Sequence, residues 1–191
     1  MELAIHLVCL YNAALSTGHF TSPWKIARVV MIPKKENATT INEYRPISLL
    51  EVPGKIFEKL LNQRVAKHME DGQLYNSFQF GFRSRRGCQD AIALGYEHMA
   101  QEKALGRFVR VVLRDVKAAF DKVWHTGVQT KIQRLGLQPL LTATLHDFFR
   151  QRTAKIVHKT AYGRDFSIEA GVPQGSTLSP TLYNIYIHDI P

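Results

Sequence analysis

The feature that most constrains this chain is a run of β-branched and apolar residues that ends in a carboxylate. Residues 108–115 read Phe-Val-Arg-Val-Val-Leu-Arg-Asp, a composition that predicts a β-strand with Asp115 at its end. A second carboxylate, Asp121, follows a short intervening segment. A carboxylate at a strand end that faces a cleft can bind a hard divalent cation. A solvated strand end followed by a helix N-cap at Asp121 explains the same pattern, so its meaning depends on the rest of the chain.

The second informative segment is a loop rich in glycine and proline. Residues 171–180 read Gly-Val-Pro-Gln-Gly-Ser-Thr-Leu-Ser-Pro and lead into an expected helix from about Leu178. Glycines let the backbone approach a ligand closely. An ordinary turn with Ser176 or Thr177 as N-cap is the alternative explanation. The loop gains functional weight when it is considered together with Asp115.

The remaining periodicity predicts a mixture of helices and strands. Apolar residues at three- to four-residue spacing predict helices over residues 1–15, 53–72, 89–104, 126–137 and 139–150. Residues 26–32 predict a strand that ends at Pro33. A hairpin is expected with arms at 154–158 and 165–169, joined around Tyr162 and Gly163. Because strict βαβ alternation is absent, an α+β fold is expected.

Composition narrows the class of protein without deciding it. The chain has 191 residues, enough for one domain or slightly more. Its net charge of +9 suits binding to a polyanion, although a lysine-rich soluble surface gives the same value. Cys9 and Cys88 are too few and too far apart for a zinc site or a disulfide framework. No segment reads as a signal peptide or a membrane span.

Six motifs, in a fixed order, make the chain resemble a known family over nearly its whole length. They are Trp24-Lys25 with residues 29–35, then residues 44–50, 54–59, 79–83, 115–125 and 171–184. The family is the reverse transcriptases of non-LTR (LINE-like) retrotransposons of the Jockey, CR1 or I type. Any one string can occur by chance, but turns and helix caps do not explain all six in order. Residues 44–50 and 79–83 look more like this group than like group II intron or telomerase-type polymerases.

This resemblance implies an architecture and a reaction. The architecture is the partial fingers and palm of a right-hand polymerase, incomplete at both ends, with a fingers-like part at 1–107 and a partial palm at 108–191. The reaction is RNA-directed DNA synthesis, in which a primer 3′-hydroxyl attacks the α-phosphorus of a deoxynucleoside triphosphate between two Mg²⁺ ions. An RNA template, a DNA primer and deoxynucleotides are the implied partners, with no membrane. The nucleus and cytoplasm are the implied location.

The resemblance also assigns roles at the reaction centre. Asp115 would be the catalytic residue that binds both metal ions, and the backbone carbonyl of Val116 would bind one of them. Phe120 would lie beneath the sugar, so that a ribose 2′-hydroxyl would collide with its ring. The alternative for Phe120 is an ordinary core phenylalanine.

Further residues would bind the nucleotide and the template. Lys34 and Arg45 would reach the incoming phosphates, since a guanidinium suits a bidentate phosphate contact. The alternative for Arg45 is a surface arginine. Gln174 and Gly175 would meet the incoming nucleotide and the templating base, and residues 80–83 would lie near the template strand.

The match also has gaps. The family's aromatic-Ala-Asp-Asp motif is expected just beyond the last helix, where this chain stops, and a thumb is missing as well. A lone carboxylate with one carbonyl is a poor cage for two metal ions. We therefore expect the isolated chain not to polymerise DNA, and a non-catalytic nucleic-acid-binding remnant of a retrotransposon is the alternative function. Arg110 and Arg114 are a further departure, because they share the strand face on which helices should pack.

Overall fold

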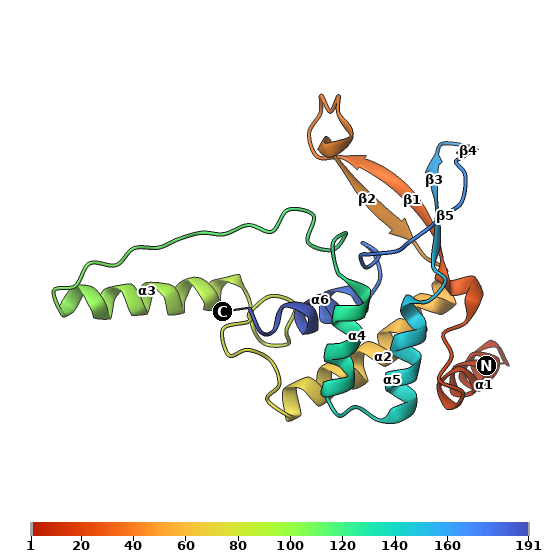
Figure 1. Ribbon diagram of the computed structural model, residues 1–191, viewed down its shortest axis with the longest axis horizontal. Helices are drawn as coiled ribbons and strands as arrows, with labels where there is room; N and C mark the ends of the chain where they lie inside the picture. Colours follow the sequence, from red (N-terminus) through yellow and green to blue (C-terminus); the bar gives the residue numbers. More distant parts are fainter. Residues whose placement is uncertain (1, 191) are drawn as a thin grey trace.

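The sheet joins strands from the first and the last third of the sequence. The computed structural model describes residues 2–190, and within them a five-stranded mixed sheet lies beside a group of helices (Figure 1). Strand β1 (Ile26–Pro33) pairs antiparallel with β2 (Tyr44–Leu49) and parallel with β3 (Thr153–His158). Short strands β4 (Ala161–Tyr162) and β5 (Phe166–Ser167) both pair antiparallel with β3. The expected α+β fold is confirmed.

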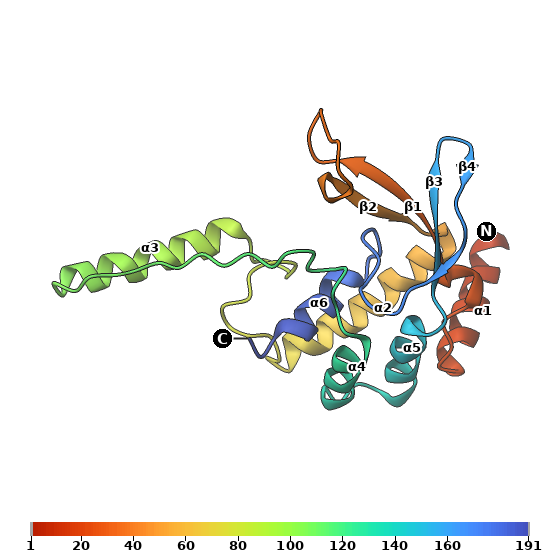
Figure 2. The same cartoon turned by 45° about the horizontal axis from the view of Figure 1, so that its top comes forward.

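Two details of the sheet differ from the sequence expectation. The sequence analysis did not predict strand β2, which contains Pro46; β2 lies at the sheet edge, where a missing amide hydrogen is tolerated. The hairpin after β3 was expected to turn around Tyr162. It turns instead before β4, with Lys159 in the left-handed region at φ 53°, and Tyr162 pairs with Val157. Figure 2 shows both hairpins rising from the helical part of the molecule.

The helices enclose one hydrophobic core that draws on both ends of the chain. The helices around it are α1 (Glu2–Ser16), α2 (Val52–Asp71), α4 (His125–Arg134), α5 (Pro139–Phe149) and α6 (Ser179–Ile187). The predicted face of α2 is buried at every fourth residue, namely Phe57, Leu61, Val65 and Met69. Two other residues assigned to that face, Ile56 and Leu60, are exposed. Within residues 2–190 no helix has both the length and the apolar character needed to cross a bilayer.

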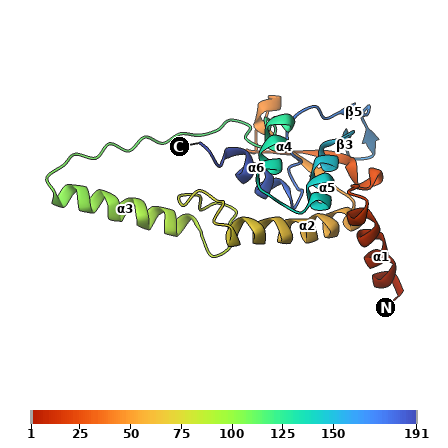
Figure 3. The same cartoon turned by 60° about the horizontal axis from the view of Figure 1, so that its bottom comes forward.

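Helix α3 (Cys88–Ala104) and the chain that follows it project from this core. Figures 1 and 3 show α3 extending away from the other helices and an extended segment returning along it. No described residue of α3 is buried, and Phe108 and Leu113 in the returning segment are almost fully exposed. This arm, residues 88–117, therefore contributes little to the packed core.

The arm corrects two expectations about residues 108–115. The strand predicted there is wrong, because these residues are extended but join no sheet in the described structure. A β-strand needs a neighbour to satisfy its N–H and C=O groups, and β-propensity does not provide one. Arg110 and Arg114, expected on a face beneath packed helices, are exposed for the same reason.

A partly buried carboxylate on α5 holds the segment that connects α1 to β1. Asp147 Oδ2 accepts the backbone N–H of Phe20 at 2.7 Å and the ammonium of Lys25 at 2.9 Å. Lys25 is only 3% exposed, and His19 Nδ1 lies 2.9 Å from the same oxygen. Burial alone would raise the pKa of Asp147, but Lys25, the Phe20 amide and His19 outweigh it and lower the pKa.

Replacement of Asp147 by alanine should destabilise the fold by about 3 kcal/mol, because the buried Lys25 ammonium loses its counter-charge. The carboxylate stabilises the fold above its unfolded pKa of about 4, and this contribution is lost as pH falls through its lowered folded pKa. The wild-type advantage should therefore shrink in acid. Urea unfolding across this pH range measures both effects. The control is D165A, which removes an exposed partner of Lys155 and should cost under about 1 kcal/mol; equal losses for the two variants would contradict the interpretation.

Candidate active site

The glycine- and proline-rich loop, residues 171–178, is held against the edge of the sheet. The backbone N–H of Ser48 on β2 donates to the carbonyl of Gln174 at 2.7 Å. Gly175 has φ 128°, and a Cβ added there would lie 2.5 Å from the Ser48 carbonyl oxygen. A side chain at this position would therefore collide with β2. The sequence analysis expected glycine to permit a close approach to a ligand. At Gly175 the group that approaches is the protein backbone at Ser48.

A buried carboxylate from α2 fixes the other end of this loop. Glu58 is 1% exposed, and its Oε2 accepts the backbone N–H of Thr177 at 2.8 Å. Burial raises the pKa of Glu58, although hydrogen bonds from Ser176 and Thr177 and the charge of Arg152 oppose the shift. Burial also lowers the pKa of Arg152 to about 10, opposed by the charge of Glu58. Each of these two buried charges therefore helps to keep the other ionised.

The segment after Asp115 runs beside the same loop. Phe120 and Val123 accept backbone hydrogen bonds from Val172 and Gly171, both at 2.8 Å. Between them, Asp121 Oδ1 accepts the Gln174 side-chain amide at 2.8 Å. Asp121 is not a helix N-cap, because α4 begins at His125.

The sequence prediction joined the loop to Asp115, whereas the direct contact of Gln174 is with Asp121. Asp115 is exposed, and its charge helps to raise the pKa of Tyr183 on α6, after burial and Tyr186. Tyr183 in turn lies against the ring of Phe120, with ring centroids 5.3 Å apart. The structure records no hydrogen bond between Asp115 and the loop, and the nearest recorded link is the ring of Tyr183, which lies near the charge of Asp115 and against Phe120.

Phe120 has features of both interpretations offered for it. Its ring is partly buried against the core beside Tyr183, and Phe82 lies on another side with ring centroids 6.1 Å apart. Phe120 as a whole is half-buried rather than fully enclosed.

The acidic residues do not form a complete metal centre. Among residues 2–190 no group of three or more His, Cys, Asp or Glu side chains could hold a metal ion. Asp115 and Val116 are both exposed and would provide three oxygen ligands at most, the two carboxylate oxygens of Asp115 and the carbonyl of Val116. Magnesium prefers six oxygens in octahedral geometry, so these residues do not fit a site for two ions by themselves.

The basic residues expected at the phosphates lie on the β1–β2 hairpin. Arg45 is exposed on β2 opposite Ile32, three residues before Ser48, which is roughly 10 Å along a strand. Lys34 follows β1, and its ammonium donates to the carbonyl of Asn42 at 2.7 Å. Arg45 is therefore near the strand segment that contacts the loop, and Lys34 is at the far end of the hairpin.

The loop at residues 79–83 is held by contacts that the sequence did not indicate. Arg83 forms a bidentate ion pair with Glu70, at 3.0 and 2.6 Å, and lies over the ring of Tyr75. Asn184 on α6 accepts the Gln79 amide at 3.1 Å and donates to the Gly81 carbonyl at 3.0 Å. Arg83, expected near the template, is thus occupied within the protein. The sequence of this loop indicates neither contact, because the partners lie 13 and 105 positions away.

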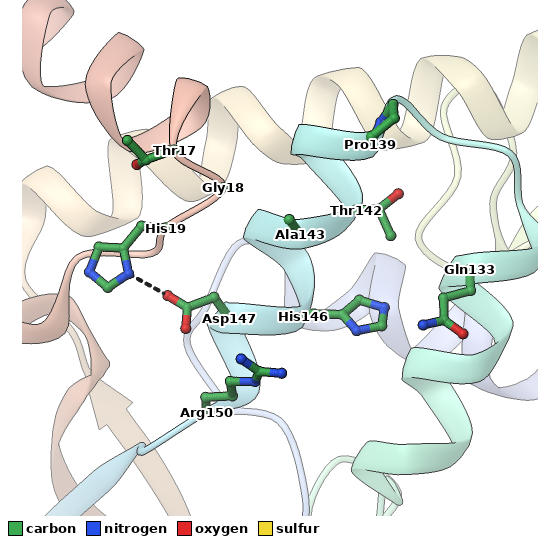
Figure 4. Close-up of a pocket in the computed structure, with 10 residues that line it drawn as sticks. All are labelled: Thr17, Gly18, His19, Gln133, Pro139, Thr142, Ala143, His146, Asp147 and Arg150. Atoms are coloured by element: carbon green, nitrogen blue, oxygen red, sulfur yellow. Dashed lines mark ion pairs between the residues drawn. The ribbon is translucent and has the colours of Figure 1, made fainter.

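Of two hollows in the surface, one is lined by predicted site residues and the other is not. The larger, of about 540 Å³, lies between the end of α1, α4 and α5 and contains none of the predicted site residues (Figure 4). Its polar lining includes His19, Asp147 and Arg150. The smaller, of about 170 Å³, is lined by Ser48, Asp121 and Gln174 together with apolar residues of the sheet. The smaller hollow is therefore the one formed by the converging motifs.

Comparison with known proteins agrees with this convergence. The family model for reverse transcriptase (RNA-dependent DNA polymerase) matches residues 32–191. The chain belongs to the reverse transcriptase family. The RNA-directed DNA polymerase from mobile element jockey of Drosophila melanogaster is 37% identical over 97% of this chain. The corresponding jockey protein of Drosophila funebris is 34% identical over 100% of it, and the probable RNA-directed DNA polymerase from transposon BS of Drosophila melanogaster is 32% identical over 98%.

These relatives confirm the resemblance to retrotransposon reverse transcriptases. The fold of this reverse transcriptase chain is the α+β fold of polymerase fingers and palm. The chain spans about a fifth of the length of these three relatives, which are covered over 20%, 21% and 21% of their own sequences.

In this reverse transcriptase chain, replacement of Glu58 by alanine should destabilise the fold by about 3 kcal/mol and release the loop, because Arg152 loses its compensating charge. The Thr177 amide should then exchange with solvent much faster, as it has lost its acceptor. Urea unfolding and amide hydrogen exchange measure the two effects. E58Q keeps an acceptor and should protect the Thr177 amide better than E58A, whereas Q63A on the exposed face of the same helix is the control. A Thr177 amide equally protected in E58A and Q63A would contradict the anchoring role.

Proposed function

We propose that this chain forms the nucleotide-binding part of an RNA-directed DNA polymerase encoded by a non-LTR retrotransposon. Its substrates are deoxynucleoside triphosphates, and its partners are an RNA template and a DNA primer. The observation that supports this most strongly is the meeting of three motifs around one hollow. Ser48, Asp121 and Gln174 come from three separate motif segments and are joined by the two hydrogen bonds described above.

The proposed roles follow from the chemistry of a deoxynucleoside triphosphate. Arg45, and Lys34 beyond it, attract the phosphates of the incoming nucleotide from the exposed hairpin. The ring of Phe120 limits space beneath the sugar, so a ribose 2′-hydroxyl is excluded. Gln174 and Gly175 place amide and backbone groups at the nucleotide and the templating base.

Asp115 is proposed as the catalytic carboxylate of the complete enzyme. With the carbonyl of Val116 it would supply oxygen ligands to magnesium, and residues outside 2–190 or substrate oxygens would have to supply the others. When bound, the two ions neutralise the charge that develops on the transferring phosphoryl group.

The proposal extends to organisation and location. Residues 1–107 would be the fingers-like part with the entry to the palm, and residues 108–191 the partial palm. The protein would act in the nucleus and the cytoplasm, where a retrotransposon RNA is made and copied.

A non-catalytic nucleic-acid-binding remnant is the second candidate function. Two observations favour it, namely the net charge of +9 and the lack of an acidic cluster in the described part of the chain. Such a protein would bind RNA–DNA hybrids but would not recognise a nucleotide that pairs with the template. The two functions therefore differ in their response to a complementary nucleotide.

The binding test uses an RNA–DNA hybrid with a dideoxy-terminated primer, Mg²⁺ and one deoxynucleotide, followed by fluorescence anisotropy. The hybrid should bind more weakly as salt rises, and the complementary nucleotide should tighten the complex. R45A should weaken the nucleotide effect about tenfold, the loss of one charge-assisted contact. R164A, an exposed arginine beyond β4, is the matched control. Equal responses to complementary and non-complementary nucleotides would contradict the polymerase proposal and favour the remnant.

Primer extension by the purified chain should give no product with Mg²⁺ and an RNA template. The described residues contain no cluster of acids that could offset the repulsion between two divalent ions. Incorporation is read on a sequencing gel against a complete reverse transcriptase as positive control. Robust extension by this chain would show that the expectation of inactivity is wrong.

A further inference from the structure

Gln174 is held through its backbone by one part of the molecule and through its side chain by another. Its backbone carbonyl is fixed by Ser48 at 2.7 Å, and its side-chain Nε2 donates to Asp121 Oδ1 at 2.8 Å. A glutamine side chain has three rotatable bonds, so the backbone contact alone would leave its amide free to move. The solvent-exposed hydrogen bond to Asp121 favours one position of that amide.

The backbone around Asp121 is itself held by the loop. The carbonyls on either side of it, of Phe120 and Val123, each accept a backbone hydrogen bond at 2.8 Å from the loop. Gly171 packs so closely that a Cβ added there would lie 2.8 Å from the Asp121 carbonyl oxygen. The backbone of Asp121 therefore has little room to shift relative to the loop that carries Gln174.

The chemistry of a carboxylate determines which way the amide faces. An ionised carboxylate only accepts hydrogen bonds, whereas the carboxamide of glutamine donates from nitrogen and accepts at oxygen. Asp121 therefore requires the nitrogen of Gln174 to face it. This leaves the carbonyl oxygen and the second N–H of Gln174 in one defined orientation at the hollow lined by Ser48, Asp121 and Gln174.

We infer that Asp121 is a positioning residue that selects one orientation of the Gln174 amide, and so determines how the loop recognises an incoming nucleotide. This inference rests on the proposed function. A flipped amide would present a donor where the nucleotide meets an acceptor, and nucleotide affinity would fall. The role needs a group at position 121 that accepts the Gln174 N–H; an ionised carboxylate can only accept, whereas the carboxamide of an asparagine can accept or donate.

That distinction gives the experiment. In the 191-residue chain, affinity for the complementary deoxynucleotide is measured on the dideoxy-terminated hybrid with Mg²⁺. D121A should weaken nucleotide binding about tenfold, the effect of one charge-assisted hydrogen bond. D121N retains a carbonyl oxygen that can accept the Gln174 N–H but no longer excludes the flipped amide, so it should weaken nucleotide binding by about threefold at most, well under the 1.4 kcal/mol that a tenfold change represents. D165A removes an exposed carboxylate elsewhere and controls for net charge.

A second readout follows the Gln174 amide itself. The side-chain ¹⁵N–¹H signals of Gln174, assigned by their loss in Q174A, should shift in D121A and stay near their wild-type positions in D121N. An amide signal that is unchanged in D121A would show that the hydrogen bond does not form in solution and would overturn the inference.

The outcomes separate this inference from the proposed function. If the wild type binds the complementary nucleotide and D121A binds it equally tightly, the inference is overturned and the proposed function stands. D121N as weak as D121A also overturns it, because the charge would then matter more than the acceptor. No complementary-nucleotide binding by the wild type overturns the proposed function, and with it the positioning role, even if the amide signals show the hydrogen bond.

Discussion

The site depends on the way a flexible loop is fixed by three separate parts of the fold. The loop at residues 171–178 contains glycines that give it little rigidity of its own. Ser48 holds it to the sheet, Glu58 holds it to α2, and Asp121 holds the Gln174 side chain. Because each anchor comes from a different segment, the loop has a defined position only when sheet and helices are assembled. The geometry of the hollow is therefore a property of the whole packed body.

Buried and paired charges explain why the excess of basic residues is an uncertain guide to nucleic-acid binding. Lys25 and Arg83 form ion pairs with Asp147 and Glu70, and Arg152 is fully buried. These cations are occupied within the fold, where desolvation makes an opposite charge or a hydrogen-bond acceptor necessary. Exposed side chains such as Arg45 are the ones that can attract phosphates. The number of exposed, unpaired basic side chains is therefore a better guide to nucleic-acid binding than the net charge.

The sequence predicted local structure well where the pattern was local. Helical spacing identified α2 because one stripe of it is buried in the core. The strand expected at 108–115 failed for the opposite reason, since a strand depends on hydrogen bonds to a neighbour that periodicity does not reveal. Strand β2 was missed although it pairs fully with β1. It contains Pro46, and the edge position that permits a proline is known only from the sheet.

At the site, the sequence by itself determined which residue types are present and in what order. That order was sufficient to identify the family and to select Asp115, Phe120 and Gln174 as candidates. The tertiary structure alone decided that Asp121 contacts Gln174, and that the anchor of the loop is Glu58. Such contacts join residues separated by 53 and 119 positions. Their geometry arises from packing between distant segments, so no local pattern of residues records it.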